Sequence, residues 1–378
     1  MSVNYLGLAL VLNCGSSSVK YQVVDTTLDE PIFAGLLERV TDHAAAIKII
    51  ISELGDPSAG VDVGAITVVG HRVVQGGEEF SAPTIVTDEV EHKIALLSTL
   101  APLHNPANLA GITAARAAFP HLPHVAVFDT AFHSTLPEAA YTYAIDRHVA
   151  REHGVRRYGF HGTSHAYVSR ETARLMGRDV RDINTIVLHL GNGASACAVR
   201  GGRSIDTSMG LTPLEGLVMG TRSGDIDPAV ALHLARTAGM TIDEIDTLLN
   251  RQSGMLGLTG YSDMRDAHKS ANQGNHDAIL GLEIYARRIR GYIGQYFAQM
   301  GSLDAIAFTA GVGENDYWVR SNSLAGLSGL GIEIDLDRNV RRSKEATLIS
   351  TDTSAVQVWV VPTNEEREIA LQSIAAVS

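Results

Sequence analysis

Two stretches of the chain share one layout, although they have little residue identity. Between Ile186 and Asp206, an apolar run ends at Gly191-Asn192-Gly193, and a second apolar run follows it. Between Tyr5 and Asp25, two apolar runs are likewise separated by a turn of small polar residues, Asn13 to Ser18. Each stretch is typical of two strands of one sheet joined by a tight turn. The repetition predicts two similar domains that arose by duplication.

The glycine turn also indicates a function. Two glycines around Asn192 leave the backbone unshielded, so that a bulky anion such as a phosphate can come close to the amides. We therefore expect the second copy of the motif to hold a phosphate.

Length, composition and charge narrow the class of protein. A chain of 378 residues is long enough for two domains, and its 45% hydrophobic content indicates a folded globular protein. It contains no apolar run long enough to span a membrane and no signal segment at its start, and Cys14 and Cys197 form no disulfide framework. These features predict a cytoplasmic protein without a membrane partner. The net charge of −12 argues against a nucleic-acid partner.

Apolar runs alternate with helical periodicity along the rest of the chain, which predicts an α/β fold. Further buried strands are expected at residues 65–69, 124–128, 305–309 and 356–361. Helices are expected at residues 43–54, 89–100, 108–118, 229–237, 242–250, 275–301 and 367–376. Residues 260–266 are expected to form a polar turn.

Four glycine-containing segments can be considered for phosphate contacts. GSSSVK, at residues 15–20, lacks the second glycine of a P-loop and leads into a strand, which excludes a Walker-type site. Arg72 follows a strand and precedes two glycines, and Arg222 lies in a long glycine-rich loop; both are candidate anion clamps, although an exposed arginine beside a turn is favoured for the Arg72 motif taken alone. Gly311-Val312-Gly313 lies between a strand and a helix and suits a nucleotide, but it lacks the third glycine of a dinucleotide motif.

Other polar residues have two interpretations each. Asp129 ends a buried strand, where α/β sheets place ligand chemistry, but it is equally suited to cap a helix. His161 and His165 have the spacing of a metal pair, yet a phosphate contact or a buried structural role is favoured because no acidic or cysteine ligand is near. Glu365 can cap the last helix or hold a metal, and the cap is favoured. Asn13 and Lys20 are polar exceptions in or beside apolar strands.

Taken together, the motifs resemble the acetate and propionate kinase family of the actin, sugar-kinase and heat-shock-chaperone ATPase superfamily. The matching segments are NCGSSSVKY, GHRVVQGG, APLHNP, VFDTAFH, RRYGFHGTSH, HLGNGAS, GLTPLEGLVMGTRSGDIDP, FTAGVGEN and VPTNEE, in family order from residue 13 to residue 366. The resemblance implies two duplicated actin-like (ribonuclease H-like) α/β domains with an active-site cleft between them. We expect one domain at residues 1–130 plus 364–378, with a returning C-terminal helix, and a nucleotide-binding domain at 131–363.

The resemblance also implies an activity. The family transfers a phosphoryl group between ATP and acetate, giving ADP and acetyl phosphate, with magnesium or in its place manganese. Arg72, Arg222 and His161 are expected to hold the phosphoryl group, in keeping with a reaction that depends on positioning and charge neutralisation. Asn13 and Glu365 are expected at the metal. Asp129 is expected to act on the metal rather than as a general base, because acetate is already an anion.

The same resemblance implies the binding residues and the assembly. Nucleotide contacts are expected from Lys20, His189, Gly191, Asn192, Gly193, Asp263, Met264, Arg265, Gly311, Val312, Gly313, Glu314 and Asn315. A small apolar pocket for the acetate methyl group is expected from Val74, Leu103, Phe160 and Pro213. The family implies a homodimer.

The chain departs from the family pattern in three places. Gln75 stands where the family usually has His, and the segments between Asp25 and Gly70 and around Asp263 are short. A propionate or butyrate kinase is the alternative enzyme, because pocket residues separate acids that differ by one methylene only modestly. An ATP-driven chaperone is the alternative of another class, but it would need a partner-binding extension.

Overall fold

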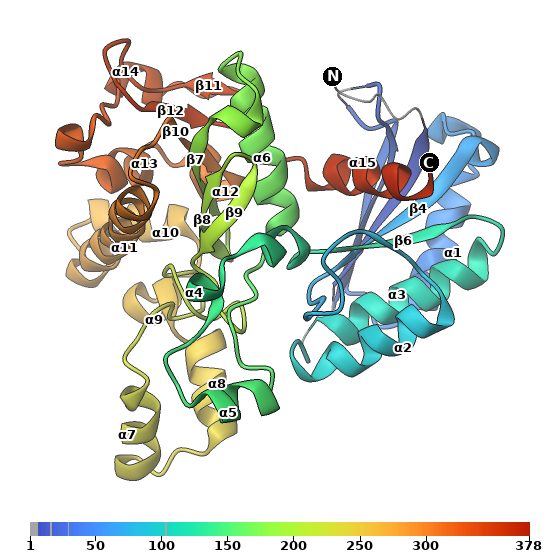
Figure 1. Ribbon diagram of the computed structural model, residues 1–378, viewed down its shortest axis with the longest axis horizontal. Coiled ribbons are helices and arrows are strands. Elements are labelled where there is room, and N and C mark those ends of the chain that lie inside the picture. The colour runs from blue at the N-terminus through green and yellow to red at the C-terminus, as the bar shows by residue number, and fades with distance from the viewer. Residues whose placement is uncertain (1–6, 16, 29, 103) are drawn as a thin grey trace. The chain divides into compact units, whose positions relative to one another are not determined.

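The computed structural model describes residues 7–15, 17–28, 30–102 and 104–378 (Figure 1). The chain divides into two units. The first contains the described residues up to Ser134 together with Phe160–Tyr167 and Asn364–Ser378; the second contains Thr135–Gly159 and Val168–Thr363. Residues 131–134 and 160–167 therefore pack with the first unit, whereas the boundary expected from the sequence put them in the second.

The first unit is built on a six-stranded mixed sheet of order β3-β2-β1-β4-β6-β5. The strands β1, β4 and β6 are parallel, and β2, β3 and β5 join them in antiparallel pairs. The strand bounds are β1 Leu8–Cys14, β2 Ser18–Asp25, β3 Phe33–Glu38, β4 Ile66–Val73, β5 Thr84–Ile85 and β6 His124–Phe128.

Side-chain alternation along β1 sends its residues to opposite faces of this sheet. Leu10 and Leu12 pack in a core with α1 (His43–Leu54) and α3 (Asn105–Ala118). Ala9 and Val11 pack in a second core against α15 (Glu365–Val377), on the other face (Figure 1). The helix α2 (Asp88–Leu96) lies beside α3 and adds to the cover of the first face.

The second unit repeats this topology with the strand order β9-β8-β7-β10-β12-β11. Its parallel strands are β7, β10 and β12, and β8, β9 and β11 join them in antiparallel pairs. The strand bounds are β7 Asn184–Leu190, β8 Ala194–Arg200, β9 Arg203–Thr207, β10 Ala305–Thr309, β11 Thr347–Leu348 and β12 Gln357–Val360. The matching order of two six-stranded sheets confirms the predicted duplication.

The remaining helices belong to the second unit, except that α6 (Gly162–Leu175) begins in the first. The longest, α11 (His276–Met300), packs against β7 and β8, and none of the described helices is both long and apolar enough to cross a membrane. The others are α4 Glu138–Tyr141, α5 Arg147–Glu152, α7 Ala229–Thr237, α8 Ile242–Arg251, α9 Gly254–Thr259, α10 Met264–Asn272, α12 Ala310–Asn315, α13 Tyr317–Leu324 and α14 Leu336–Asn339.

Three segments expected outside regular structure lie partly or wholly within it. Of the polar turn predicted at residues 260–266, residues 260–263 lie outside regular structure, whereas residues 264–266 are the first residues of α10; the Asp263 side chain accepts a hydrogen bond from Arg265 N at 2.8 Å and caps this helix. The Gly311-x-Gly313 motif lies inside α12 rather than between a strand and a helix. Asn13, expected in a turn, is paired with Lys20 inside the β1–β2 ladder.

Candidate active site

The first unit gathers polar side chains where three neighbouring strands of its sheet end. Asn13 lies near the end of β1, Arg72 near the end of β4, and Asp129 directly after β6. Arg72 donates from Nε and Nη2 to the two carboxylate oxygens of Asp129, at 2.9 and 2.7 Å. Its Nη1 makes a longer contact of 3.5 Å with Asn13 Oδ1. Asp129 therefore fixes the plane of the guanidinium, and the Nη1 edge has the weaker protein contact.

The Arg72–Asp129 pair is buried on its acidic side, since the Asp129 side chain is 1% exposed. Burial by itself would lower the pKa of Arg72, but the carboxylates of Asp129 and Glu365 raise it above its ordinary value. The guanidinium thus stays charged. The alternative that Asp129 serves only as a helix cap does not account for its bidentate contact.

The start of α15 brings further carboxylates into the first unit. Asn364 caps this helix, because its Oδ1 accepts from Arg367 N at 3.0 Å; the favoured capping role for Glu365 was therefore wrong. Burial raises the pKa of Glu365; the Arg72 guanidinium and Lys20 oppose this shift, whereas Asp129 and Glu366 add to it. Lys20, expected at the nucleotide, instead forms an ion pair with Glu366 at 2.8 Å.

The donor atoms of this group suit a hard cation. Asn13, Asp129 and Glu365 offer amide and carboxylate oxygens, which Mg²⁺ prefers. Within the described part of the chain, no three His, Cys, Asp or Glu side chains form a ready metal cage. Mg²⁺ usually keeps several waters and binds one or two carboxylates together with substrate phosphates. The residues therefore fit Mg²⁺ that is held jointly with a phosphate.

His161 lies where the chain enters α6. Its φ of 58° is unusual for a residue with a side chain, and the next residue, Gly162, donates from its backbone to Asp129 O at 2.9 Å. A Cβ on Gly162 would collide with that carbonyl oxygen, so only glycine permits this approach. His165 is buried and its ring packs edge-on against His133, with the centroids 5.7 Å apart. The structure thus joins the His161 turn to Asp129.

Two asparagines of α3 hold the backbone that follows Arg72. Asn108 accepts from Val74 N at 3.1 Å and donates to Cys14 O at 2.6 Å, and it thereby joins the ends of β4 and β1. Asn105 makes the same two-sided contact with the backbone N and O of Gln75, both at 3.0 Å. The candidate methyl-pocket residues Val74 and Phe160 are buried. Leu103, the third candidate, is outside the described residues.

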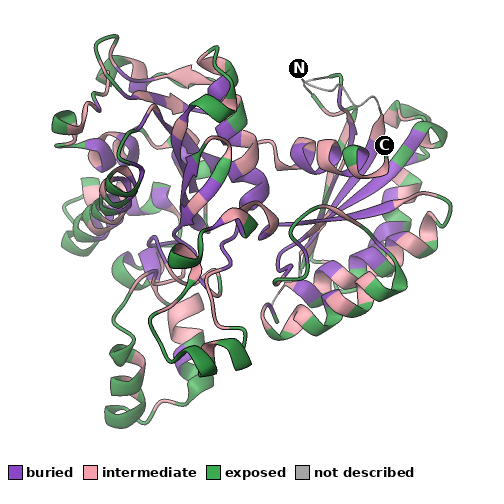
Figure 2. Cartoon of the chain, viewed as in Figure 1, coloured by how far each residue is buried: buried purple, intermediate pink, exposed green. Residues whose placement is uncertain are grey.

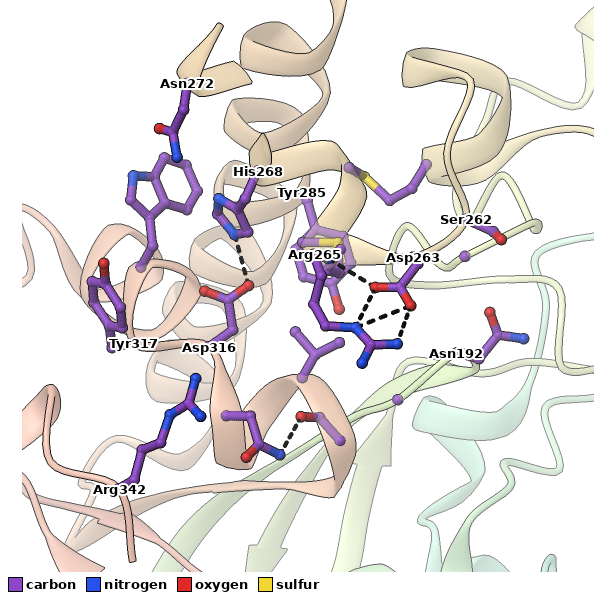
Figure 3. A pocket seen from close by; sticks show the side chains of 18 residues that line it. Asn192, Ser262, Asp263, Arg265, His268, Asn272, Tyr285, Asp316, Tyr317 and Arg342 are labelled. Carbon is purple, nitrogen blue, oxygen red and sulfur yellow. Dashed lines mark hydrogen bonds and ion pairs between the residues drawn. The ribbon is translucent and has the colours of Figure 1, made fainter. Parts of the chain in front are cut away.

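The second unit contains a cavity of about 850 Å³ (Figure 3). Its walls come from the β7–β8 turn, Gly220, α9, the loop before α10, α10 itself, α11, α12, the start of α13 and Arg342. Eight of the expected nucleotide residues line it: Gly191, Asn192, Asp263, Met264, Arg265, Gly311, Val312 and Asn315. A nucleotide-sized space is therefore lined by segments that are far apart in the sequence.

The polar end of this cavity is formed by backbone turns. Gly191 N donates to Gly193 O at 3.0 Å, which closes the turn predicted to hold a phosphate. Gly220 N donates to Asn192 O at 2.9 Å, and a Cβ on Gly220 would collide with the Asn192 side chain. Asp263 and Arg265 pair with each other, and this contact lowers the pKa of Asp263 to about 2.

Four of the expected nucleotide residues of the second unit are not among the residues that line the cavity: His189, Gly193, Gly313 and Glu314. His189 is buried in β7, and Gly313 is buried against the strands. Glu314 accepts from Thr363 N at 3.2 Å, and burial raises its pKa.

Arg222 lies in the long loop of the second unit. Its Nη1 donates to Pro213 O at 3.2 Å, and burial lowers its pKa. The loop is held by a second arginine, Arg157, which donates to the carbonyls of Thr207, Ser208 and Met209 and pairs with Glu215 at 2.7 Å. The guanidinium of Arg222 is thus held on one side by a backbone carbonyl within a fixed loop.

Comparison with known proteins places the chain in a family. A sequence model of the acetokinase family matches residues 39–371. The acetate kinase of Leifsonia xyli subsp. xyli is 56% identical, and the alignment covers 99% of this chain and 100% of that protein. The chain belongs to the acetokinase family. The family resemblance stated from the sequence and the predicted kinase activity class are therefore confirmed.

Solved structures of the acetokinase family agree with the fold. The structure of Porphyromonas gingivalis acetate kinase has a TM-score of 0.94 and 40% identity, covering 98% of this chain and 100% of that one. The propionate kinase of Francisella tularensis has a TM-score of 0.91 and 39% identity, with 97% and 99% coverage. The predicted α/β fold with two related domains is confirmed.

The sequence did not identify several side chains of the cavity. His268 Nε2 and Asp316 Oδ2 are 2.7 Å apart, and the His268 ring packs edge-on against Trp318. These residues line the cavity with Tyr285 and Arg342. One signal was available: Met264 and His268 have the i,i+4 spacing of one helix face. It was missed because residues 260–266 were interpreted as a turn.

Proposed function

We propose that this member of the acetokinase family transfers a phosphoryl group reversibly between ATP and acetate. The observation that carries the proposal is Arg72, a permanent cation oriented by a buried carboxylate beside the buried Val74. Relatives named acetate kinase match the chain over its whole length. A guanidinium can bind two oxygens of one phosphoryl group, and an apolar wall suits a methyl group.

The transfer is direct and in line. An oxygen of the acetate carboxylate forms a bond to the γ-phosphorus of ATP, and the bond from that phosphorus to the bridging oxygen of ADP breaks. Arg72 and Arg222 bind the equatorial oxygens of the moving group, and His161 donates to it. No general base is needed, because the carboxylate attacks as an anion. Asp129 orients Arg72, a role that the sequence did not suggest.

Asn13, Asp129 and Glu365 would hold Mg²⁺, with Mn²⁺ as a substitute. When bound, the ion neutralises negative charge on the phosphate oxygens. The cavity of the second unit binds the nucleotide, with Gly191 and Asn192 at its phosphates and residues 263–265 and 311–315 around the nucleoside.

Of the residues expected at the methyl group of the acid, Val74 and Phe160 are buried apolar residues of the first unit, in keeping with this role. Propionate is the second candidate substrate, because the propionate kinase structure resembles this chain nearly as closely as the acetate kinase structure does. One methylene is worth only about 1–3 kcal/mol of discrimination in such a pocket.

A steady-state assay with acetate, propionate and butyrate, run in both directions, tests the proposal. We expect phosphorylation of acetate with the highest kcat/KM. Val74→Ala should raise the butyrate-to-acetate ratio of kcat/KM about 10-fold. Val73→Ala is the control, since Val73 is the last residue of β4 and packs in the core with Phe80 and Phe128. No ATP-dependent acid phosphorylation would refute the function, and an unchanged ratio in Val74→Ala would refute the pocket.

We also propose a cytoplasmic homodimer. Cys14 and Cys197 are buried free thiols, in keeping with a reducing compartment. The helix α7 has no buried residue, although Val230 and Leu232 are apolar and exposed (Figure 2). A helix of nine residues that buries no face is only marginally stable by itself. A second copy of the chain that covers α7 would supply this face.

A further inference from the structure

The loop that carries Arg222 is closed at its base by a two-sided contact. Asp225 N donates to Gly216 O at 2.9 Å, and Gly216 N donates to Asp225 Oδ1 at 2.7 Å. This contact between Gly216 and Asp225 is the neck of the loop. Residues 217–224 therefore form a loop whose ends meet, as in the compact surface loops that frequently carry function. Arg222 lies inside this loop.

Asp225 also ties the neck to the long helix α11. Tyr292 donates from its hydroxyl to Asp225 Oδ2 at 2.7 Å, and Arg288 Nη1 forms an ion pair with the same oxygen at 3.0 Å. Both Nη atoms of Arg288 donate to Asp225 O, at 3.1 and 3.2 Å. Burial raises the pKa of Tyr292, and the Asp225 carboxylate raises it further, so the phenol keeps its proton and donates. Because α11 packs against β7 and β8, these contacts fix the neck to the core of the second unit.

Different elements hold the chain on the two sides of the neck. On the side of the loop, Ser223 N donates to Leu249 O, in α8, at 3.0 Å. On the other side, Glu215 pairs with Arg157 at 2.7 Å. A loosened neck would therefore let the two sides shift against each other.

The Arg222 side chain depends on both sides of the neck. Its backbone belongs to the loop, whereas its Nη1 donates to Pro213 O, before the neck, at 3.2 Å. The same Nη1 lies 3.7 Å from Met219 Sδ, which is only a weak acceptor. A carbonyl contact fixes a guanidinium less firmly than the bidentate carboxylate that holds Arg72. The direction of the Arg222 guanidinium therefore depends on where the neck places Pro213.

We propose that Asp225 is a positioning residue for phosphoryl transfer: it closes the neck and, bound to Tyr292 and Arg288, it aims Arg222 at the phosphoryl group. The inference rests on the proposed function, in which Arg222 binds an oxygen of the moving group. That contact is made mainly in the transition state, so a loosened neck lowers kcat. Asp225, Arg288 and Tyr292 are not among the residues that line the cavity, so the affinity for the nucleotide stays unchanged.

The first test compares two aspartates of the same segment. Asp225→Asn keeps one side-chain oxygen but not two, so it cannot bind both the neck and α11. We expect it to lower kcat about 10-fold and to leave the Kd for ADP, measured by calorimetry, as in the wild type. Asp227→Asn is the matched control, because Asp227 is exposed and contacts only the start of α7, at Ala229 N, among the hydrogen bonds of the described residues. Its kcat should equal that of the wild type.

A milder variant carries the test if Asp225→Asn fails to fold. Tyr292→Phe keeps the neck and removes one hydrogen bond between Asp225 and α11, and we expect it to lower kcat about 3-fold. Tyr296→Phe is its control on the same helix, because Tyr296 is buried and its hydroxyl has no hydrogen-bond partner among the residues that the structure describes. Wild-type kcat in Tyr292→Phe would contradict the role of α11.

A double-mutant cycle separates the positioning of Arg222 from a general structural role. If Asp225 acts through Arg222, then Asp225→Asn should lower the residual kcat of Arg222→Ala by less than about 2-fold. A loss as large as in the wild-type background would overturn the inference, and so would wild-type kcat in Asp225→Asn. A wild type that does not phosphorylate an acid with ATP would instead overturn the proposed function.

Discussion

At the scale of the residue, Arg72 carries the clearest expectation. Its two-point contact with Asp129 orients a planar group that lysine cannot imitate. We expect Arg72→Lys to lower kcat about 100-fold or more, because the contact to the phosphoryl group is made mainly in the transition state. Steady-state kinetics with saturating ATP and acid measure the loss.

Lysine is preferred to alanine at this position because it keeps a cation beside the buried Asp129, whose unpaired charge would destabilise the fold. Arg116→Lys is the control. Arg116 belongs to the same unit and also forms ion pairs with carboxylates. It lies on α3, however, and its partners Asp88 and Glu91 lie on α2. Comparable kcat in Arg72→Lys and the wild type would rule out the clamp.

A second residue-scale prediction concerns two buried histidines. His71 Nε2 and His124 Nδ1 are 2.9 Å apart on neighbouring strands. Burial lowers the pKa of both, well below 6.5 for His71; Arg116 lowers that of His124 further, while Phe119 O and Glu91 oppose the shift. The unfolded chain binds more protons below pH 6.5, so stability should fall as the pH falls through this value.

At pH 5.5, each histidine can cost up to about 1.4 kcal/mol of unfolding free energy relative to neutral pH. Denaturant unfolding at pH 7.5, 6.5 and 5.5 measures this loss. His71→Gln should make the dependence shallower, because one titrating group is removed and a donor to His124 is kept. His92→Gln, an exposed position on α2, should leave it as in the wild type. A flat profile in the wild type would contradict the prediction.

At the scale of the element, the sequence predicted segments whose pattern is local. The bounds of α1, α7, β6 and β10 match the expected residues, because each has clear periodicity or an apolar run with turn residues beside it. The strand β3 was not predicted, because its exposed positions include the apolar residues Ala34 and Leu36, so its sequence does not alternate between apolar and polar residues. The helix α10 was missed because Gly260 suggested a loop, although the local cap at Asp263 was a helix-start signal in the sequence.

The helix α3 supplies an element-scale prediction. Asn108 joins Val74 N to Cys14 O, and so fixes the ends of two strands beside Arg72 and Asn13. Asn108→Asp keeps the acceptor for Val74 N but loses the donor to Cys14 O. We expect a several-fold rise in the KM for the acid and a shifted acetate-to-butyrate ratio. The Kd for ADP should not change, because the cavity belongs to the second unit.

A changed KM for the acid with an unchanged Kd for ADP indicates a positioning role for Asn108. General destabilisation of the fold would instead lower all activities together. Thr113→Ala, on the exposed side of the same helix, is the control. If Asn108→Asp leaves the acid KM and the acid ratio unchanged, then Asn108 has no positioning role.

At the scale of the whole molecule, the duplicated topology could be predicted because both halves contain the same strand–turn–strand motif. The cavity could not be, since Gly220, His268, Asp316 and Arg342 come together only in the fold. Likewise, the pairing of Arg72 with Asp129 depends on two strands that are neighbours in the sheet but 57 residues apart in the chain. The family resemblance implied the roles of the site residues, whereas contacts such as the hydrogen bond from Asn108 to Cys14 O are visible only in the structure.

The assembly gives the final prediction. If a second copy covers α7, a charge on its exposed apolar face should separate the copies. Leu232 is 55% exposed, and Leu232→Glu should weaken dimerisation about 10-fold or more, as measured by sedimentation equilibrium over a range of concentrations. Leu336→Glu is the matched control, because Leu336 is 62% exposed on α14 and belongs to no proposed interface. A monomeric wild type would refute the dimer, and a dimer equally stable in Leu232→Glu would show that α7 does not form its interface.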